Sequence, residues 1–516
     1  MSSGTYVETA PSALTEDQAS FARTIGLTGL MATILGTLIL ILNAAKARLG
    51  IEIGNNVAFA AIVVGLAMMF FHAARDTDPF VRRLYGYIGG IGLPLAGLIL
   101  SLLPVIISAA RSAPEDGSPK QIISLFFPFG WACFLAGLFF LMSYCRSETE
   151  EPHRRYGLMA LGGLGAALAV VGLGGGLIAS SFALTYGSVM ALLGLGYLVA
   201  FVSQLGGADL GGYRPALAIG ALGVLVFVVA LARSMFPGSL PYFVPAGLVL
   251  MAFGLAYALT AVFLVSDWTI VVLIRRELMA YFASPIAYIL LFISALVAWI
   301  NYNQFVYILS ASRLPVQEPI VLIFYLGNLF GVFMLVFQVP ALTMRLLSEE
   351  KRTGTYEVLM CAPVSEAPVV LSKLLAALAF YMLIWAVWLV FLLDVRVEAG
   401  KPFEYRPLIS FYLALAASGA SFLAMGLFFS SLTRNQIVAA AMTFVGMVAW
   451  IVLFLIARDL PEESTRFVVL NHLSFVTLWA DSLRGRLNLP DLVVQASIAV
   501  FFTFLTVKVL EARRWS

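Results

Sequence analysis

The sequence predicts an all-α, polytopic membrane protein, and three observations lead to this fold class. Hydrophobic residues make up 61% of the 516 residues. Charged residues make up only 11%, whereas a soluble globular domain is roughly half apolar and a quarter charged. The apolar residues also occur in runs of about 20, the length at which a helix spans a bilayer. We therefore expect the lipid bilayer to surround most of this chain.

These runs predict about 14 transmembrane helices. In the first half, eight candidate spans cover approximately residues 25–44, 55–73, 86–110, 124–145, 158–179, 181–203, 215–234 and 242–266. In the second half, six candidates cover approximately residues 285–301, 320–347, 367–394, 407–431, 435–457 and 491–510. An even number of spans places both termini on one side of the membrane. In the first half, basic residues are more frequent in the loops on the N-terminal side, so we expect both termini to be cytoplasmic and the membrane to be the cell (inner or plasma) membrane.

A change in composition predicts a boundary between two membrane modules. Residues 268–283 contain Arg275, Arg276 and Glu277 among apolar and aromatic residues, and the pair Ser284–Pro285 follows. Such residues are typical of the membrane–water boundary, and the residue before a proline disfavours a continuing helix. A helix lying in the interface fits this pattern, and the alternative is a last span that runs long and then turns. The two modules are residues 1–267, with eight spans and no identified function, and residues 268–516.

The sequence lacks the usual signatures of catalysis. The only Gly-Lys pair, Gly400–Lys401, does not belong to a phosphate-binding G-x-x-x-x-G-K-[ST] loop, and HExxH is absent. Three cysteines and three histidines lack the spacing of a disulfide framework or a metal site, and the basic residues form no stripe suited to nucleic acid. We therefore expect no catalytic, cofactor or metal site in this chain and no nucleic-acid partner.

A charged segment interrupts the apolar sequence after the span 320–347. Glu349, Glu350, Lys351 and Arg352 end that span, and the triplet Thr353-Gly354-Thr355 that follows is suited to breaking one helix and capping another. A second, short helix is predicted at about residues 354–363. Thr355 would begin this helix and Glu357 would lie in its first turn. Tyr356, Leu359 and Met360 would form its apolar face, and Pro363 would end it. A docking helix and an ordinary interfacial loop are both compatible with these residues.

The segment "LTMRLLSEEKRTGTYEVLMCAPVSEAPVVLSKLLAAL" resembles the ABC-2 type permeases of ABC transporters, in which E-E-[KR]-R-x-G-T-x-E-x-L-x-x-x-P-[VI] follows the second helix of a six-helix core. "RRELMAYFASPIAYILL" is similar to the elbow helix of that family, and the sequence from Asn471 to Trp515 resembles its ending. The resemblance covers residues 268–516 and is closest to the gliding-motility-associated and copper-processing-type branch.

The resemblance implies a permease subunit, not itself an enzyme, in an ATP-driven transporter. Residues 268–283 would be the elbow helix and about 354–363 the coupling helix. A cytoplasmic ABC ATPase subunit would bind ATP and Mg²⁺, and a second permease, identical or related, would complete the assembly in the lipid bilayer. The coupling residues would be Glu349, Glu350, Lys351, Arg352, Gly354, Thr355, Tyr356, Glu357, Leu359, Met360 and Pro363. The elbow and gate residues would be Arg275, Arg276 and Glu277.

Two other functions stay open. The chain would be a non-transporting membrane scaffold if the ATPase worked mechanically on a motility or assembly partner. It would be a secondary carrier if Lys373, Asp394 and Asn328 met around one cavity, because such carriers place ionisable groups inside the membrane.

Overall fold

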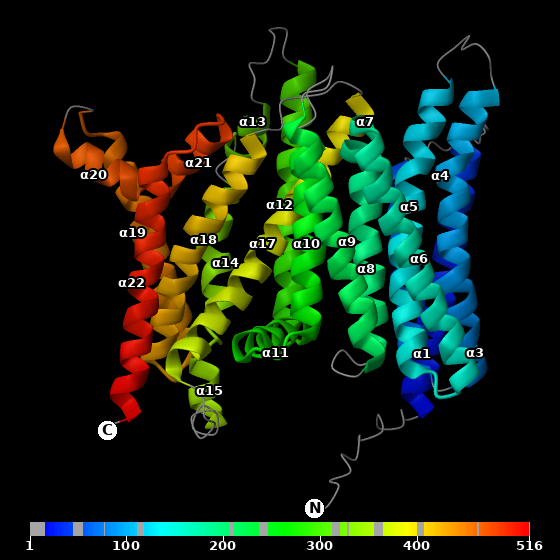
Figure 1. The fold of residues 1–516 in the computed structure, drawn as a ribbon, viewed down its shortest axis with the longest axis horizontal. Coiled ribbons are helices and arrows are strands. Elements are labelled where there is room, and N and C mark those ends of the chain that lie inside the picture. The colour runs from blue at the N-terminus through cyan, green and yellow to red at the C-terminus, as the bar shows by residue number, and fades with distance from the viewer. Residues whose placement is uncertain are drawn as a thin grey trace, which may run out of the picture. The chain divides into compact units, whose positions relative to one another are not determined.

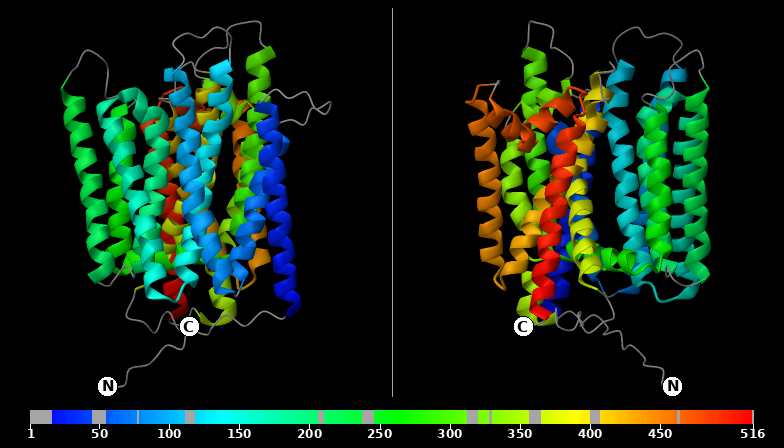
Figure 2. Two further views of the ribbon diagram at one scale, coloured as in Figure 1. Left: turned by 90° about the vertical axis from the view of Figure 1, so that its right-hand side faces the viewer. Right: turned by 60° about the vertical axis from the view of Figure 1, so that its left-hand side comes forward.

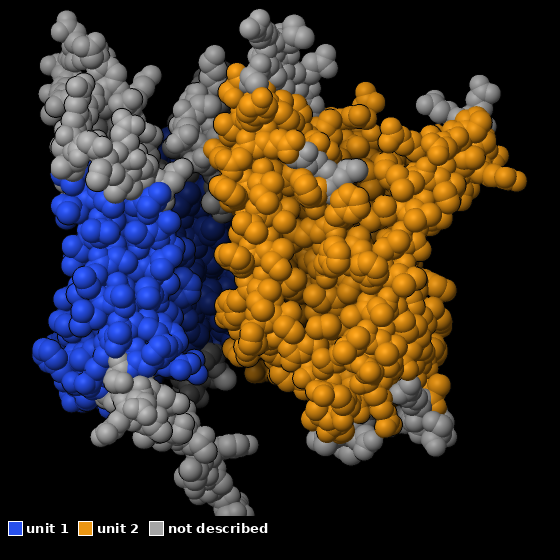
Figure 3. Space-filling model, turned by 180° about the vertical axis from the view of Figure 1, so that it is seen from behind, with its two compact units in different colours: residues 1–265 blue, residues 266–516 orange. Residues whose placement is uncertain are grey.

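The protein is almost entirely helical. The computed structural model describes residues 16–44, 55–76, 78–110, 118–205, 210–236, 246–311, 320–327, 330–355, 365–399, 407–461 and 464–514. No strand occurs among these described residues. The chain divides into two compact units, unit 1 (residues 1–265) and unit 2 (residues 266–516), which Figure 3 draws in different colours. The predicted all-α membrane fold is confirmed.

In its described residues, unit 1 consists of α-helices interrupted by two short π-helices. Its helices are α1 (Glu16–Ala44), α2 (Asn55–Arg75), α3 (Pro79–Tyr85), η1 (Gly86–Gly92), α4 (Leu93–Ala110), α5 (Ser118–Ser147), α6 (Glu151–Ile178), α7 (Ser180–Phe182), η2 (Ala183–Gly187), α8 (Ser188–Leu205), α9 (Leu210–Met235) and α10 (Leu248–Val265) (Figure 1).

Helices of unit 1 pack mainly against neighbours in the sequence. α1 packs along α2, α4 along α5, α6 along α8 and α9 along α10. The last pair approaches closely at Gly223 and Gly254, where a Cβ atom on Gly223 would lie 2.6 Å from the Gly254 carbonyl oxygen. Such small residues let membrane helices meet backbone to backbone. Unit 1 is therefore built mainly from closely packed helix pairs.

One predicted span of unit 1 begins too late. The sequence places its start at residue 86, whereas the helical segment begins at Pro79 and continues through α3, η1 and α4. Asp78 caps the first turn, because its side chain accepts a hydrogen bond from the Phe80 amide at 2.9 Å. The polar cap and the two arginines of α3 hid this start from a search for apolar residues.

Unit 2 contains the helices that form the candidate site. They are α11 (Thr269–Ala283), α12 (Pro285–Ala311), α13 (Ile320–Leu326), α14 (Phe330–Thr343), α15 (Ser348–Thr353), α17 (Glu366–Ala399), α18 (Pro407–Leu432), α19 (Gln436–Arg458), α20 (Thr465–Leu473), α21 (Phe475–Leu483) and α22 (Leu489–Arg514). Within this unit, α11 lies across the direction of the long helices, at the same end as α15 (Figure 1). α20 and α21 lie at the opposite end (Figure 2).

The core of unit 2 joins helices that are far apart in the sequence. α18 packs along α22, α11 along α17 and α14 along α19. Large aromatic side chains fill the space between them, and the fully buried ones include Tyr325, Tyr381, Trp385, Trp388, Phe411 and Trp479. These rings contribute strongly to the packing of the core, because each of them buries a large surface area. The buried apolar residues of unit 2 thus form one continuous core.

Thirteen helical stretches of the described chain are long and apolar enough to cross a membrane, seven in unit 1 and six in unit 2. The span predicted at 124–145 falls in α5, which is not among them; the side chains of its residues up to 129 are outside the description. The span predicted at 320–347 is wrong in its limits. α13 ends at Leu326, and the apolar stretch of membrane length is Phe330–Thr353.

Candidate functional site

The candidate site lies where α11, α14, α15 and α17 meet at one end of unit 2. Its geometry begins with the turn between α11 and α12, where Ser284 is extended (φ −88°, ψ 130°) before Pro285. Proline disfavours the helical conformation in the preceding residue, and it is well suited to the first position of a helix. The chain therefore turns sharply here. This turn allows α11 to lie across the end of the unit.

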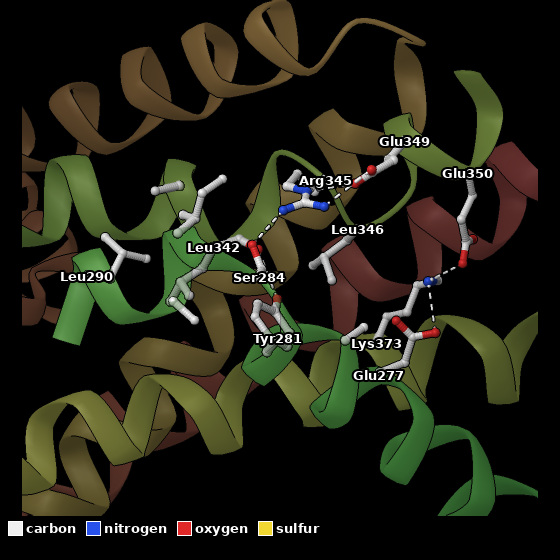
Figure 4. A pocket seen from close by; sticks show the side chains of 14 residues that line it. Glu277, Tyr281, Ser284, Leu290, Leu342, Arg345, Leu346, Glu349, Glu350 and Lys373 are labelled. Carbon is white, nitrogen blue, oxygen red and sulfur yellow. Dashed lines mark hydrogen bonds and ion pairs between the residues drawn. The ribbon is translucent and has the colours of Figure 1, made fainter. Parts of the chain in front are cut away.

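A pocket of about 290 Å³ opens between these helices (Figure 4). One part of its wall is apolar and the other contains charged side chains. The lining residues are Glu277, Ala280, Tyr281, Ser284, Ile286, Ala287, Leu290, Ala341, Leu342, Arg345, Leu346, Glu349, Glu350 and Lys373. Glu277 comes from α11, Glu349 and Glu350 come from α15, and Lys373 comes from α17.

Lys373 is the most deeply buried charged group of the site. Its side chain is 2% exposed, and its Nζ atom lies 2.6 Å from Glu350 Oε1 and 3.1 Å from Glu277 Oε1. An isolated ammonium group is costly to bury, whereas paired and hydrogen-bonded charges are tolerated. The two carboxylates therefore make the buried position of Lys373 possible. In doing so they join three helices that are separate in the sequence.

Arg276 completes this cluster from its exposed side. Its Nη2 atom lies 2.7 Å from Glu277 Oε1 and 3.7 Å from Glu350 Oε1, and its side chain is 49% exposed. The cluster formed by Arg276, Glu277, Glu350 and Lys373 contains two positive and two negative groups. We call it the four-charge cluster.

A second link connects α15 to the turn between α11 and α12. The Arg345 guanidinium donates two hydrogen bonds to Glu349, at 2.6 Å from Nε and 3.2 Å from Nη2. Its Nη1 donates a third bond, of 2.7 Å, to Ser284 Oγ. Two-pronged arginine–carboxylate pairs fix orientation as well as distance. The position of α15 is thus tied to the start of α12.

Serines of α18 anchor the start of α15. The backbone amides of Leu347 and Ser348 both donate to Ser430 Oγ at 3.1 Å, and Lys351 Nζ contacts the Ser431 carbonyl oxygen. These bonds satisfy amide groups that a helix start leaves without intrahelical partners. α15 is therefore held on both sides, by α18 and by the charged links to α11 and α17.

The end of α15 is set by glycine. Gly354 has φ +75°, in the left-handed region that glycine adopts without the penalty of a Cβ atom. Thr355 Oγ1 lies 2.9 Å from Thr353 Oγ1, and both side chains are exposed, as is that of Arg352. The helix break at Thr353-Gly354-Thr355 is observed. However, α15 is a separate helix, because a turn at residues 344–347 divides it from α14.

Tyr281 fixes α11 against two other helices. Its hydroxyl group donates to the Leu342 carbonyl oxygen at 2.9 Å, and its ring stacks on Phe380 of α17 at 5.2 Å between centroids. Burial raises the pKa of Tyr281 above its usual range, and the nearby Glu277 adds to this effect. The phenol therefore stays neutral and keeps its hydrogen bond across the ordinary pH range.

The structure brings only some of the sequence-predicted residues together. Glu277, Arg276, Glu349 and Glu350 belong to the linked network described above. Arg275 instead donates from Nη2 to the Ser266 carbonyl oxygen at 3.1 Å. Five predicted coupling residues lie outside the described residues, and with them most of the helix predicted at about 354–363: Tyr356, Glu357, Leu359, Met360 and Pro363.

Sequence reasoning missed three residues of the site, Lys373, Arg345 and Ser284. The available signal was the cost of an ionisable residue within an apolar helix, which marks such residues as functional candidates. Lys373 entered only the secondary-carrier alternative, with Asn328 and Asp394. Asn328 and the side chain of Asp394 lie outside the description, and Lys373 itself is engaged by Glu277 and Glu350.

Comparison with protein families matches residues 300–471 to the model described as ABC-2 family transporter protein. This range includes α15 and Lys373, and it begins after α11. Comparisons with curated proteins and with solved structures gave no significant match.

Proposed function

We propose that this chain is the membrane-spanning permease subunit of an ATP-driven ABC transporter, with ATP hydrolysed by a separate cytoplasmic subunit. The ABC-2 match at residues 300–471 supports the transporter class. The observation that carries the proposal further is the attachment of α15 to α11 and α17 through two charged links. In such a transporter, force from a soluble motor must reach helices that lie in lipid, and this attachment offers a physical route.

In the proposed mechanism, the segment after Gly354 docks into the ATPase and α15 follows its movement. The first link, Arg345 with Glu349 and Ser284, passes displacement to the start of α12. The second link, the four-charge cluster, passes it to α11 and α17. Coupling of this kind requires contiguous elements with two discrete arrangements. The buried Lys373 would resist separation of these helices, so they would move as one body.

The full assembly follows from this role. ATP and Mg²⁺ would bind to the partner ATPase, and a second permease, identical or related, would pair with this chain. Residues 349–355 and the segment that follows would lie on the cytoplasmic side of the cell membrane, with both termini. The resemblance to the gliding-motility-associated and copper-processing-type branch belongs to this proposal too.

Copurification followed by reconstitution tests the proposal. The full chain is isolated with its associated proteins, placed in proteoliposomes, and assayed for ATP hydrolysis and for its stimulation by the permease. Coupling free energies between sites typically change an affinity by about 5- to 150-fold, and we expect Glu350→Gln to reduce permease-dependent hydrolysis by about fivefold, the lower end of this range. Lys508→Met is the matched control, because Lys508 is exposed on α22 and contacts Glu511 and the Phe504 ring, both on its own helix.

Other outcomes would overturn the proposal. A chain that copurifies with no ATPase would contradict a permease role. An ATPase that copurifies but hydrolyses ATP equally fast with and without this chain would favour the scaffold alternative. Unchanged hydrolysis in Glu350→Gln would remove α15 from the coupling path.

A further inference from the structure

Unit 1 contains an apolar groove between α6, α8 and α9. Its volume is about 500 Å³, and apolar side chains dominate its walls, among them Leu158, Met159, Val170, Phe201 and Leu222. All three helices are long and apolar enough to cross a membrane. The groove is thus part of a surface that faces either lipid or another membrane helix.

Two adjacent glycines of α6 open the groove. Gly162 and Gly163 both line it, and neither fills it with a side chain. A Cβ atom on Gly163 would meet no other atom within 4 Å, and one on Gly162 would approach only the Phe201 ring, at 3.3 Å. Elsewhere on α6, glycines such as Gly165 and Gly172 instead meet neighbouring backbone at 3.0 Å or less. Gly163 therefore leaves open space, whereas Gly162 faces a side chain of α8 and not its backbone.

One end of the groove is cationic and aromatic. Arg155 lines it, and Arg214 precedes the lining residue Pro215 near the start of α9. Tyr156 and Tyr213 are exposed beside these arginines, at 58% and 46%. Exposed tyrosines and arginines at the end of membrane helices mark the level of the lipid head groups. Arg155 pairs with Glu151 at 3.3 Å, with both side chains 72% exposed, and such surface pairs are weak.

We propose that this groove binds one acyl chain of an anionic phospholipid, whose phosphate is held by Arg155 and Arg214. From Arg155 to Val170 the α6 backbone rises about 22 Å, which exceeds the roughly 15 Å hydrocarbon depth of one leaflet and leaves room for a head group. The guanidinium groups can donate several hydrogen bonds to phosphate oxygens. Three features favour this ligand: the apolar wall, the cationic end, and a length that accommodates one acyl chain together with its head group. The proposal concerns unit 1 and does not depend on the transport function of unit 2.

Native mass spectrometry of the full-length protein tests the groove. Delipidated protein is titrated with phosphatidylglycerol and, separately, with phosphatidylcholine, and bound lipids are counted. We expect Gly163→Leu to remove at least one phosphatidylglycerol, because the leucine would occupy the groove. Gly174→Leu is the matched control: Gly174 is on the same helix, a Cβ there also meets no atom within 4 Å, and it does not line the groove.

Charge variants test the head-group assignment independently. We expect the double variant Arg155→Gln/Arg214→Gln to lower the preference for phosphatidylglycerol over phosphatidylcholine about tenfold, which corresponds to about 1.4 kcal/mol. Arg233→Gln, at the other end of α9, should leave the preference unchanged. Both changed arginines are exposed, so a folding defect is not expected.

Three results would overturn the proposal. The first is equal lipid binding by Gly163→Leu and Gly174→Leu. The second is an unchanged head-group preference after both arginines are replaced. The third is a groove occupied by a helix of a second protein chain, detected as a stable complex that Gly163→Leu disrupts while lipid counts stay constant.

Discussion

Lys373 Nζ lies 2.6 Å from Glu350 Oε1, so a lysine of a long apolar helix is paired with a glutamate of the short charged helix α15. Glu277 of α11 approaches the same ammonium group at 3.1 Å. This arrangement makes Lys373 the common partner of two carboxylates from different helices. Three elements far apart in the sequence are therefore joined through one side chain.

Removing the Lys373 ammonium group should destabilise unit 2. In Lys373→Met, Glu277 and Glu350 lose their buried partner, and breaking a buried ion pair from one side costs about 3–5 kcal/mol. Thermal unfolding of the detergent-solubilised protein would measure this loss. Lys508→Met should unfold like the wild type. The triple variant Lys373→Met/Glu277→Gln/Glu350→Gln should recover part of the stability, and a triple variant less stable than the single one would contradict the pairing.

Gly354 should tolerate only residues that adopt positive φ. A Cβ atom there meets no neighbour within 4 Å among the described residues, so we assign the effect of Gly354→Ala to the backbone conformation at φ +75°. The left-handed region costs a non-glycine residue about 1–2 kcal/mol, with asparagine the best tolerated. Hydrogen exchange of the α15 amides should therefore accelerate in Gly354→Ala and less in Gly354→Asn. Equal protection in both variants and the wild type would show that this turn does not hold α15.

The close approach of α9 and α10 should depend on Gly254. A Cβ atom there would lie 2.7 Å from the Gly223 carbonyl oxygen and 2.8 Å from the Phe227 amide nitrogen, both of them backbone atoms. Gly254→Ala should therefore separate the two helices and lower the thermal stability, by about 1–3 kcal/mol as for other overpacked sites. Gly174→Ala, which meets no neighbour, should have no such effect. A Gly254→Ala protein as stable as this control would contradict the packing.

The Arg83–Glu148 contact should give unit 1 a pH-dependent stability. The hydrogen bond from Arg83 Nε, 2.9 Å from Glu148 Oε2, holds the pKa of Glu148 below its usual range. A carboxylate whose pKa is lower in the folded than in the unfolded protein stabilises the folded state at pH values above the unfolded-state pKa. This stabilisation is lost as the pH falls through the folded-state pKa. The wild type should thus exceed Glu148→Gln in melting temperature at neutral pH, and the difference should shrink on acidification below about pH 4.5, the ordinary pKa of a glutamate.

The exposed Glu151 provides the control for this pH dependence. Glu151→Gln removes a carboxylate whose pair with Arg155 is 72% exposed on both sides, so its difference from the wild type should be small at every pH. A Glu148→Gln difference that stays constant from neutral to acidic pH would contradict the role of the Arg83 contact.

The sequence predicts the long apolar helices best, because each one reflects a local property, its hydropathy. Thus α18 begins at the predicted residue, Pro407, and the turn before α12 follows from Ser284–Pro285. The interruptions are harder to predict. The π-helix η1 lies where Gly86 and Gly89 pack against Tyr144 and Phe140, rings from another helix. Such a feature depends on packing partners that local sequence does not specify.

The candidate site shows the same division. Glu349, Glu350 and Arg276 stand out in the sequence because charges are rare in this chain. Their joint partner Lys373 does not, since it lies in a different apolar segment and the pairing depends on how α11, α15 and α17 are brought together. The serine anchors on α18 are hidden for the same reason. Hydropathy locates charges along the chain, whereas tertiary structure decides which of them meet.

The pairing of helices described above also sets the order in which the two units can be completed during synthesis. In unit 1, α1 can pack against α2, and α9 against α10, as soon as the second helix of each pair has been synthesised, because the partners are neighbours in the chain. In unit 2, α18 can pack against α22 only after α22 has been synthesised, and α11 can pack against α17 only after α17 has been synthesised. Contacts between distant segments form slowly and leave surfaces exposed meanwhile. The packing of unit 2 therefore cannot be completed until α22, the last helix of the described chain, has been synthesised.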